Sequence, residues 1–488
     1  MRRMLLVLAV LGAVTAPVVA PVLAQQAPLR LTLQEAIERA HARGPVALAA
    51  KATRDAARAR DRAFGADLMP QVALSGTVPA YNRSIIPVLQ QDGSTLFRPQ
   101  EQSQSDLNMA ISQRIPFTGG DLFINSGLSR IDRVGTLSSR TFQTTPVQIG
   151  IRQDILRPNR QRWDNREQAL RADVAERAYK EALEDISITT ANSFFDYYTA
   201  KLGLENAAAN ASVNDTLYTL NKGRFEVGKI GENDLLQSEL ALLRAQVSLD
   251  GARLEHDRTL ASLRLLLDLP RGAPLEIVVP NDIPDVVADT VTAVQMAQKH
   301  RAQMLELELQ EVQADRRIAE ARFGSGFGGT LTASMGLNQS AGTLDQAYRD
   351  LREAQRFQVG VSLPIVQWGG RSANIQAARL DGDRVDYLAR QTREQTAQEA
   401  HFAALGLAQA RRQLSIAAKA DTVGAKRFEV AKNRYVIGRI GIDNLYLAQA
   451  EKDAALGQYL QSLRGYWVAY YRLRRVTMFD FATGAVIR

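Results

Sequence analysis

The sequence repeats itself at an interval of 210 residues, most clearly in a short stretch that carries two glycines. The segment RFEVGKIGENDL from Arg224 aligns with RYVIGRIGIDNL from Arg434, and five of these twelve positions are identical. At the same interval, VQIGIRQDIL from Val147 aligns with FQVGVSLPIV from Phe357. An internal duplication of this size predicts two structurally related halves rather than several unrelated domains.

Composition excludes several kinds of site. The 488 residues include no cysteine, which rules out disulfides, thiolate metal ligands, a cysteine nucleophile and a lipid-modified N-terminal cysteine. The four histidines are scattered, and the net charge of +8 comes from basic residues that alternate with acidic ones, so no nucleic-acid partner is expected. The Gly-rich FGSGFGG from Phe323 lacks the GK[ST] of a phosphate loop. We expect no catalytic residue, no cofactor and no metal.

The N-terminus has the pattern of a secretory signal. Two arginines precede an apolar run, and small residues end at Ala24, so residues 1–24 are predicted to be a cleaved signal peptide. The mature chain is therefore expected to be exported. No later segment has the ~18 consecutive apolar residues of a membrane helix, so any crossing of a membrane must use β-strands.

Two very long helices are predicted, from about residue 160 to 224 and from about 372 to 435. Both segments lack proline and contain little glycine, and ~65 residues at 1.5 Å rise extend over roughly 100 Å. A second helix returns after each one. Leucines and their equivalents in the returning helices are spaced 4, 3 and 4 residues apart, which is typical of a coiled-coil seam. These positions are Leu236, Leu240, Leu243 and Val247, and Leu456, Leu460, Leu463 and Trp467.

The repeated glycine motif has the features of a helical hairpin tip. Gly228 is suited to the left-handed residue that ends a helix, and Gly231 permits the reversal. Asp234 followed by Gln237 resembles a capping box for the returning helix. The tips are therefore predicted at residues 228–234 and 438–444. The second tip repeats the arrangement with Gly438 and Gly441, and with Asp443 or Asn444 as the cap.

Segments of alternating apolar and polar residues predict strands at about 66–157 and 326–366. The first strand region is longer, because 83 positions separate Phe64 from Val147 whereas 34 separate Phe323 from Phe357. The 49 extra residues include a predicted hairpin at 105–132 that turns around Thr118, Gly119 and Gly120. It is either an extracellular excursion or two further barrel strands. Arg114 and Pro116 would fit poorly in a lipid-facing strand, which slightly favours the excursion.

These features resemble the TolC-like outer membrane efflux proteins, the exit ducts of tripartite drug pumps and type I secretion systems. RFEVGKIGENDLL, RYVIGRIGIDNL and LPIVQWGGR from Leu363 carry the resemblance. It implies an α+β membrane protein with two repeats, residues 25–270 and 271–488. Three copies would share an outer membrane β-barrel that continues into a long periplasmic α-helical coiled-coil tunnel. An equatorial region would come from about residues 267–287 and the two termini.

The resemblance also implies a function. The chain would be a passive outer membrane channel of a Gram-negative bacterium with a large periplasmic portion, and it would carry small molecules or polypeptides. Its partners would be two further copies, a periplasmic adaptor (membrane fusion) protein, an inner membrane pump or ABC transporter, and outer membrane lipid. The alternative is an exported coiled-coil structural or adhesive protein without a pore. The sequence does not indicate which substrate is exported.

Two sets of site residues follow from the resemblance. The pore-constriction candidates are expected to differ from the family pattern, because Asn444 stands where a second acid is usual and Ile440 where a basic partner is usual. The docking candidates at the tips are Gly228, Ile230, Gly231, Gly438, Ile440 and Gly441. The constriction candidates are Asp234, Tyr435, Asp443 and Asn444.

Overall fold

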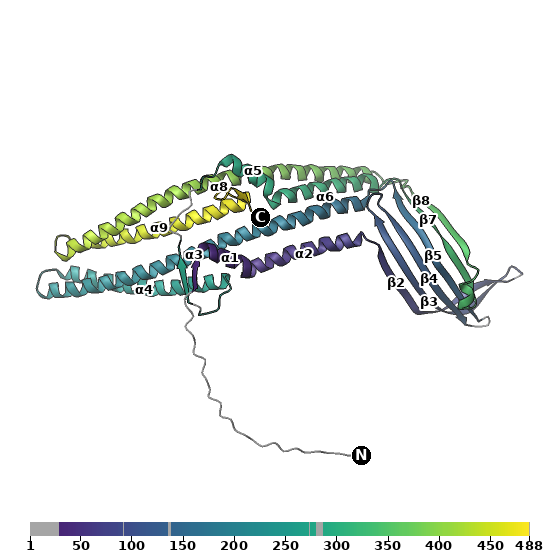
Figure 1. The fold of residues 1–488 in the computed structure, drawn as a ribbon, viewed down its shortest axis with the longest axis horizontal. Coiled ribbons are helices and arrows are strands. Elements are labelled where there is room, and N and C mark those ends of the chain that lie inside the picture. The colour runs from purple at the N-terminus through teal and green to yellow at the C-terminus, as the bar shows by residue number, and fades with distance from the viewer. Residues whose placement is uncertain (1–28, 91, 135–137, 273, 280–285, 488) are drawn as a thin grey trace, which may run out of the picture.

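The computed structural model describes residues 29–90, 92–134, 138–272, 274–279 and 286–487. The expected signal peptide, residues 1–24, and part of the expected equatorial segment, residues 273 and 280–285, lie outside the described residues. The molecule is elongated, with a twisted β-sheet at one end, a bundle of long helices beyond it, and two helical hairpin tips at the opposite end (Figure 1).

Six antiparallel strands form the sheet, in the order β2-β3-β4-β5-β7-β8. Among the described residues, β2 and β8 each pair on one side only, so the sheet has two free edges. A short helix, α7 (Leu344–Ala347), lies in the connection between the last two strands. The strands are β2 (Gln71–Leu89), β3 (Thr95–Ile115), β4 (Gly120–Val134), β5 (Ser139–Ile155), β7 (Gly328–Ala341) and β8 (Arg352–Ser362).

The preference for an excursion at residues 105–132 was wrong. β3 and β4 occupy this segment and pair with each other and with their neighbours inside the sheet. Pro116 lies in the turn after β3, where its missing N–H removes no ladder bond. Arg114 pairs with Asp121 on the polar side of the sheet, so it does not conflict with an apolar face.

The two faces of the sheet differ in chemistry. Cross-strand pairing joins an apolar row through Val72, Ile111, Ile124, Ile149 and Met335, which share one face because paired residues point to the same side. The opposite face carries rows such as Arg114, Asp121, Arg152, Thr332 and Gln358. One face is therefore apolar over five strands and the other is polar.

Four helices continue directly from the sheet and lie side by side. α2 (Pro45–Asp67) packs on α3 (Arg160–Glu226), α3 on α6 (Ala302–Gly324), and α6 on α8 (Gly370–Val436). α3 and α8 each contain 67 residues, which corresponds to about 100 Å. Beyond the equator they return as α4 (Glu232–Leu266) and α9 (Ile442–Thr477). No described helix is both long and apolar enough to span a membrane.

Short elements form a thickened equator around the middle of the long helices. They are β1 (Leu29–Thr32) paired with β6 (Leu275–Val278), α1 (Leu33–Arg43), α5 (Thr290–His300), β9 (Phe479–Asp480) and β10 (Ala485–Val486). α1 begins with a complete capping box between Thr32 and Glu35. The main core cluster is here, and its largest members come from α3 and α9. They include Phe194, Phe195, Tyr466, Trp467, Tyr470 and Tyr471.

The two returning helices use their predicted seams differently. In α9, Leu460, Leu463 and Trp467 are buried in the chain. In α4, the corresponding side chains remain exposed, and Val247 reaches 74% exposure. α8 also carries exposed aliphatic residues at intervals of seven. The exposed α4 stripe is Leu236, Leu240, Leu243 and Val247, and the exposed α8 stripe is Ile416, Val423 and Val430.

Candidate functional site

The two tip turns have the same backbone geometry. Gly228 has a φ of +70° and Gly438 a φ of +76°, so glycine is favoured at both positions. The amide of the following residue donates to the carbonyl five residues earlier, from Lys229 to Arg224 (2.8 Å) and likewise in the second tip (2.9 Å). This is the bond pattern of a Schellman helix end. The left-handed glycine predicted at position 228 is confirmed.

The predicted caps of the returning helices are wrong. α4 and α9 begin after Gly231 and Gly441, whose backbones are extended, and neither helix has a side-chain cap. Gln237 does not fold back on its own helix, because its amide donates to Asp443 Oδ1 of the other hairpin (2.6 Å). Asp234 and Asp443 instead lie in the first helical turns, where the helix dipole favours acidic residues.

A buried hydrogen bond ties the two hairpins together just behind the tips. The Tyr435 hydroxyl donates to Asn221 Oδ1 at 2.7 Å, and the two residues are only 5% and 0% exposed. Arg224 donates to the carbonyl of Val436 (3.0 Å), and its guanidinium lies 5.4 Å from the Tyr435 ring centre. Leu217, Ile442 and Leu445 surround Tyr435. The constriction candidate Tyr435 is therefore engaged across the hairpin interface, whereas Asn444 is exposed.

Asn221 was missed in the sequence. Its spacing from Asn214 could have identified it, because residues seven positions apart lie on the same face of a helix. Both asparagines are on the buried face of α3. A buried asparagine at a coiled-coil core position is the usual device that fixes which helix faces which. The Asn221 Nδ2 atom has no partner in the described structure, so the bond from Tyr435 is the only one described for this side-chain amide.

The apolar residues at the tips are not equally exposed. Ile230 is half-buried, and Ile440 packs against the small core around Tyr435 and Leu445. The residues next to the left-handed glycines are more open, since Val227 is 66% exposed and Ile437 64% exposed. Each tip therefore presents an exposed aliphatic side chain beside its glycine.

Further from the tips, the contact between α3 and α9 is polar. The Lys452 ammonium donates to the amide oxygens of Asn206 (2.9 Å) and Asn210 (3.2 Å) and lies 4.9 Å from the ring centre of Phe428. The same two amides donate to the Asp453 carboxylate at 2.7 and 2.9 Å. Each asparagine thus bridges a cation and an anion, so the two hairpins meet through a closed network of charge-assisted bonds.

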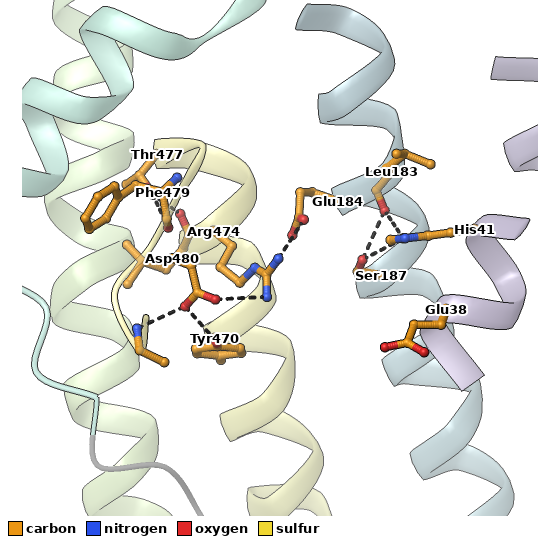
Figure 2. Close-up of polar contacts among 12 residues, drawn as sticks. Glu38, His41, Leu183, Glu184, Ser187, Tyr470, Arg474, Thr477, Phe479 and Asp480 are labelled. Carbon is orange, nitrogen blue, oxygen red and sulfur yellow. Dashed lines mark hydrogen bonds and ion pairs between the residues drawn. The ribbon is translucent and has the colours of Figure 1, made fainter. Parts of the chain in front are cut away.

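Ion pairs at the equator fix the C-terminal segment (Figure 2). Arg474 donates to Glu184 of α3 (3.0 Å) and to Asp480 (3.4 Å), and the Tyr470 hydroxyl also donates to Asp480 (2.9 Å). Burial raises the pKa of Glu184, although the charge of Arg474 acts in the opposite direction. The cluster therefore holds the end of α9 and the segment after it against α3.

His41 of α1 contacts α3 beside this cluster. Its Nε2 atom lies 2.8 Å from the carbonyl oxygen of Leu183 and 3.0 Å from the Ser187 hydroxyl (Figure 2). Burial is the main cause of its lowered pKa, and the positive charge of Arg474 adds to the effect. His41 is thus held neutral near pH 7 as a structural contact.

Neither a family model nor a curated protein matches the sequence. Solved structures do match the fold over most of the chain. The CmeC outer membrane channel of Campylobacter jejuni has a TM-score of 0.67 at 16% identity, and the match covers 91% of this chain and 85% of that one. The outer membrane protein VceC of Vibrio cholerae has a TM-score of 0.65 at 15% identity, with 92% and 96% covered.

The open-state MtrE outer membrane channel of Neisseria gonorrhoeae has a TM-score of 0.60 at 15% identity, with 91% and 88% covered. At these identities the matches establish the fold alone. The resemblance to TolC-like outer membrane channels is therefore confirmed at the level of the fold.

Proposed function

We propose that the protein is a passive outer membrane channel, the exit duct of a tripartite efflux pump or a type I secretion system. The observation that carries this proposal is the sheet, which has one apolar face, one polar face and two free edges. In lipid, a sheet of this kind has its backbone groups satisfied only if its edges are closed. The apolar face would contact lipid and the polar face would line the pore.

The dimensions of the apolar face fit a bilayer. On β5 this face carries Val147, Ile149, Ile151 and Ile155, with Gln153 as one polar position among them, and so extends over nine residues. A tilted strand needs about 9–11 residues to cross the hydrocarbon core. Beyond this band, the same face carries an ionic cluster in which Arg130 and Arg140 both bond Asp132. Charged residues are expected where the strands leave the lipid.

Closure requires other copies of the chain. A second copy placed beside the first brings its β8 edge to the free β2 edge, and it brings its α8 toward α4. Each of these two helices carries an exposed aliphatic stripe, and a seven-residue spacing is the repeat that coiled-coil packing requires. Following the fold resemblance, we propose that three copies form the ring.

The tip region supplies the gate and the docking surface in this proposal. The bond from Tyr435 to Asn221 keeps the α8 and α3 ends together, so its loss would let the hairpins separate. Asp234, Asp443 and Asn444 lie near the starts of α4 and α9 and would constrict the opening in this proposal. The docking surface would comprise Gly228, Ile230, Gly231 and their counterparts Gly438, Ile440 and Gly441, with exposed Val227 and Ile437 as its apolar contacts.

The docking partner would be a hairpin of a periplasmic adaptor, which would link the channel to an inner membrane pump or ABC transporter. Val227→Asp combined with Ile437→Asp tests this assignment, because both side chains are exposed and their replacement does not open the core. We expect loss of export and of adaptor co-purification, with trimer and conductance retained. Ile440→Asp is the comparison for a folding defect, because Ile440 packs on the core of the tip and its replacement should destabilise the tip as well. Normal export by the double variant would show that the tips are not the docking site.

Fractionation tests the proposed function itself. The protein should remain with outer membranes until detergent is added, and cross-linking in detergent should give a trimer. A water-soluble, elongated periplasmic species would contradict the proposal and would favour a coiled-coil scaffold without a pore.

A further inference from the structure

Among the described residues, the β3–β4 hairpin, residues 95–134, has no counterpart in the second half of the chain. In the first half, β2 follows α2 and β5 precedes α3. In the second half, β7 follows α6 and β8 precedes α8, and β7 pairs directly with β8. β3 and β4 are inserted between β2 and β5. The first half therefore supplies four strands and the second half two.

This hairpin is continuous with the sheet wall. β3 pairs with β2 from Gln71 onward, and β4 pairs with β5 from Asp121 onward, so the inserted strands begin at the same level as the others. Their side chains keep the alternation of the neighbouring strands, with Ile111 and Ile124 on the apolar face and Asn108 and Asn125 on the polar face. A hairpin that projected from the wall would lack this shared register.

The turn of the hairpin is also fixed to the helical part. Asn159, the N-cap of α3, accepts from the Arg162 amide through Oδ1 and donates through Nδ2 to the carbonyls of Pro116 (2.9 Å) and Phe117 (3.1 Å). Gly119 has a φ of +76°, and a side chain there would meet Asn159 at 2.9 Å. One asparagine thus caps the long helix and holds the inserted turn against it.

We propose that the β3–β4 hairpin widens the channel, so that three copies of this six-stranded sheet close an 18-stranded barrel. The inference rests on the proposed function, because it requires the ring of three copies. It assigns a role to the extra residues of the first half: they set the width of the membrane pore.

The widths of the two layers support this assignment. Strands lie about 4.8 Å apart and tilt by about 35–45°, so six strands occupy roughly 35–41 Å of barrel perimeter. Four helices at 8–10 Å spacing occupy roughly 32–40 Å. The four wall helices α2, α3, α6 and α8 therefore match six strands, whereas four strands would cover only about 23–27 Å. The hairpin supplies the missing perimeter where the sheet meets the helices.

For transport, the consequence is a wide pore through the membrane. An 18-stranded barrel has about 1.5 times the perimeter of a 12-stranded one, and barrels of 16–18 strands leave an aqueous channel. The width of the barrel backbone would be about 36 Å instead of about 24 Å at a 40° tilt. A membrane barrel of this width would admit bulky hydrated solutes such as polypeptide chains.

Cysteine accessibility tests whether β3 belongs to the barrel wall, because the chain has no cysteine of its own. Single substitutions Asn108→Cys and Met109→Cys are made in the full chain and treated in membranes with a water-soluble maleimide. We expect Asn108→Cys to react at least tenfold faster than Met109→Cys. The matched pair Gln148→Cys and Ile149→Cys reports on β5, which the second half duplicates as β8.

The β5 pair separates two kinds of failure. If β5 alternates and both β3 positions react equally fast, the hairpin stands outside the wall and the widening is refuted, while the channel survives. If neither strand alternates, the sheet is not a membrane wall and the proposed function fails as well. Electron cryomicroscopy of the trimer then counts the strands directly. A barrel of 12 strands would overturn the inference, and 18 would support it.

Discussion

Replacing Tyr435 with phenylalanine removes one hydroxyl from the interface between the hairpins and leaves the ring in place. The lost bond to Asn221 is 2.7 Å long and fully buried, and the asparagine amide would then have no described partner. A buried polar group that loses its partner costs about 1–3 kcal/mol. Since each 1.4 kcal/mol is a factor of ten, the separated arrangement of the tips should become about 5–150 times more populated in each chain.

Hydrogen exchange at the tips measures this change. Amides in residues 217–226 and 430–437 should lose protection by the same factor, while those of the equatorial core stay as they are. Tyr446→Phe is the matched control, because the Tyr446 hydroxyl is buried without a described partner and burial raises its pKa to about 12. Removing that hydroxyl should leave tip protection unchanged or increased. Equal protection in Tyr435→Phe and the native protein would refute the idea that this bond holds the tips together.

Three further outcomes follow from single contacts. Gly228→Ala should cost about 1–2 kcal/mol in thermal unfolding because of its left-handed backbone. Gly231→Ala should cost less, about 0.5 kcal/mol, because its backbone is extended with no neighbour within 4 Å and only the poorer N-cap preference of alanine is lost; equal costs would contradict the turn geometry. Arg474→Met should cost about 3–5 kcal/mol because it strands the buried Glu184 carboxylate, and adding Glu184→Gln should recover part of the loss; no recovery would show that the charge is not the cause. The pKa of His41 in the folded chain is lowered below 6.5, its ordinary value in the unfolded chain, so the unfolded chain binds more protons and the free energy of unfolding falls as pH falls. His41→Gln should flatten this dependence in chemical unfolding between about pH 7.5 and about pH 5.5. An unchanged slope would exclude His41 as its source.

Local sequence signals predicted the features that depend on neighbouring residues. The long helices follow from the absence of proline over 160–224 and 372–435, and the left-handed Gly228 follows from its place after a helical segment. The predicted cap at Asp234 and Gln237 failed because a partner distant in sequence competed for the side chain. Gln237 bonds Asp443, 206 positions away, and no local pattern contains that contact.

Two further features depend on pairing between segments that are distant in the sequence. Arg114 and Pro116 counted against strands at residues 105–132 only because the sequence does not show which face of the sheet Arg114 occupies or where the hairpin turns. The register puts Arg114 opposite Asp121 on the polar face and leaves the proline in the turn. Tyr435 was identified from its place in the tip motif, but its partner Asn221 became evident only once α3 and α8 lay together. Side-chain pairing between distant segments requires the assembled fold.

Conductance of the purified protein in a planar lipid bilayer tests the channel most directly. The native protein, as the proposed trimer, should insert and give discrete, low-conductance steps, because the tips are tied. Tyr435→Phe should give larger or longer openings through the same proposed barrel. Insertion of the protein without any conducting steps, in both the native form and this variant, would contradict the proposal that the polar face of the sheet lines a pore.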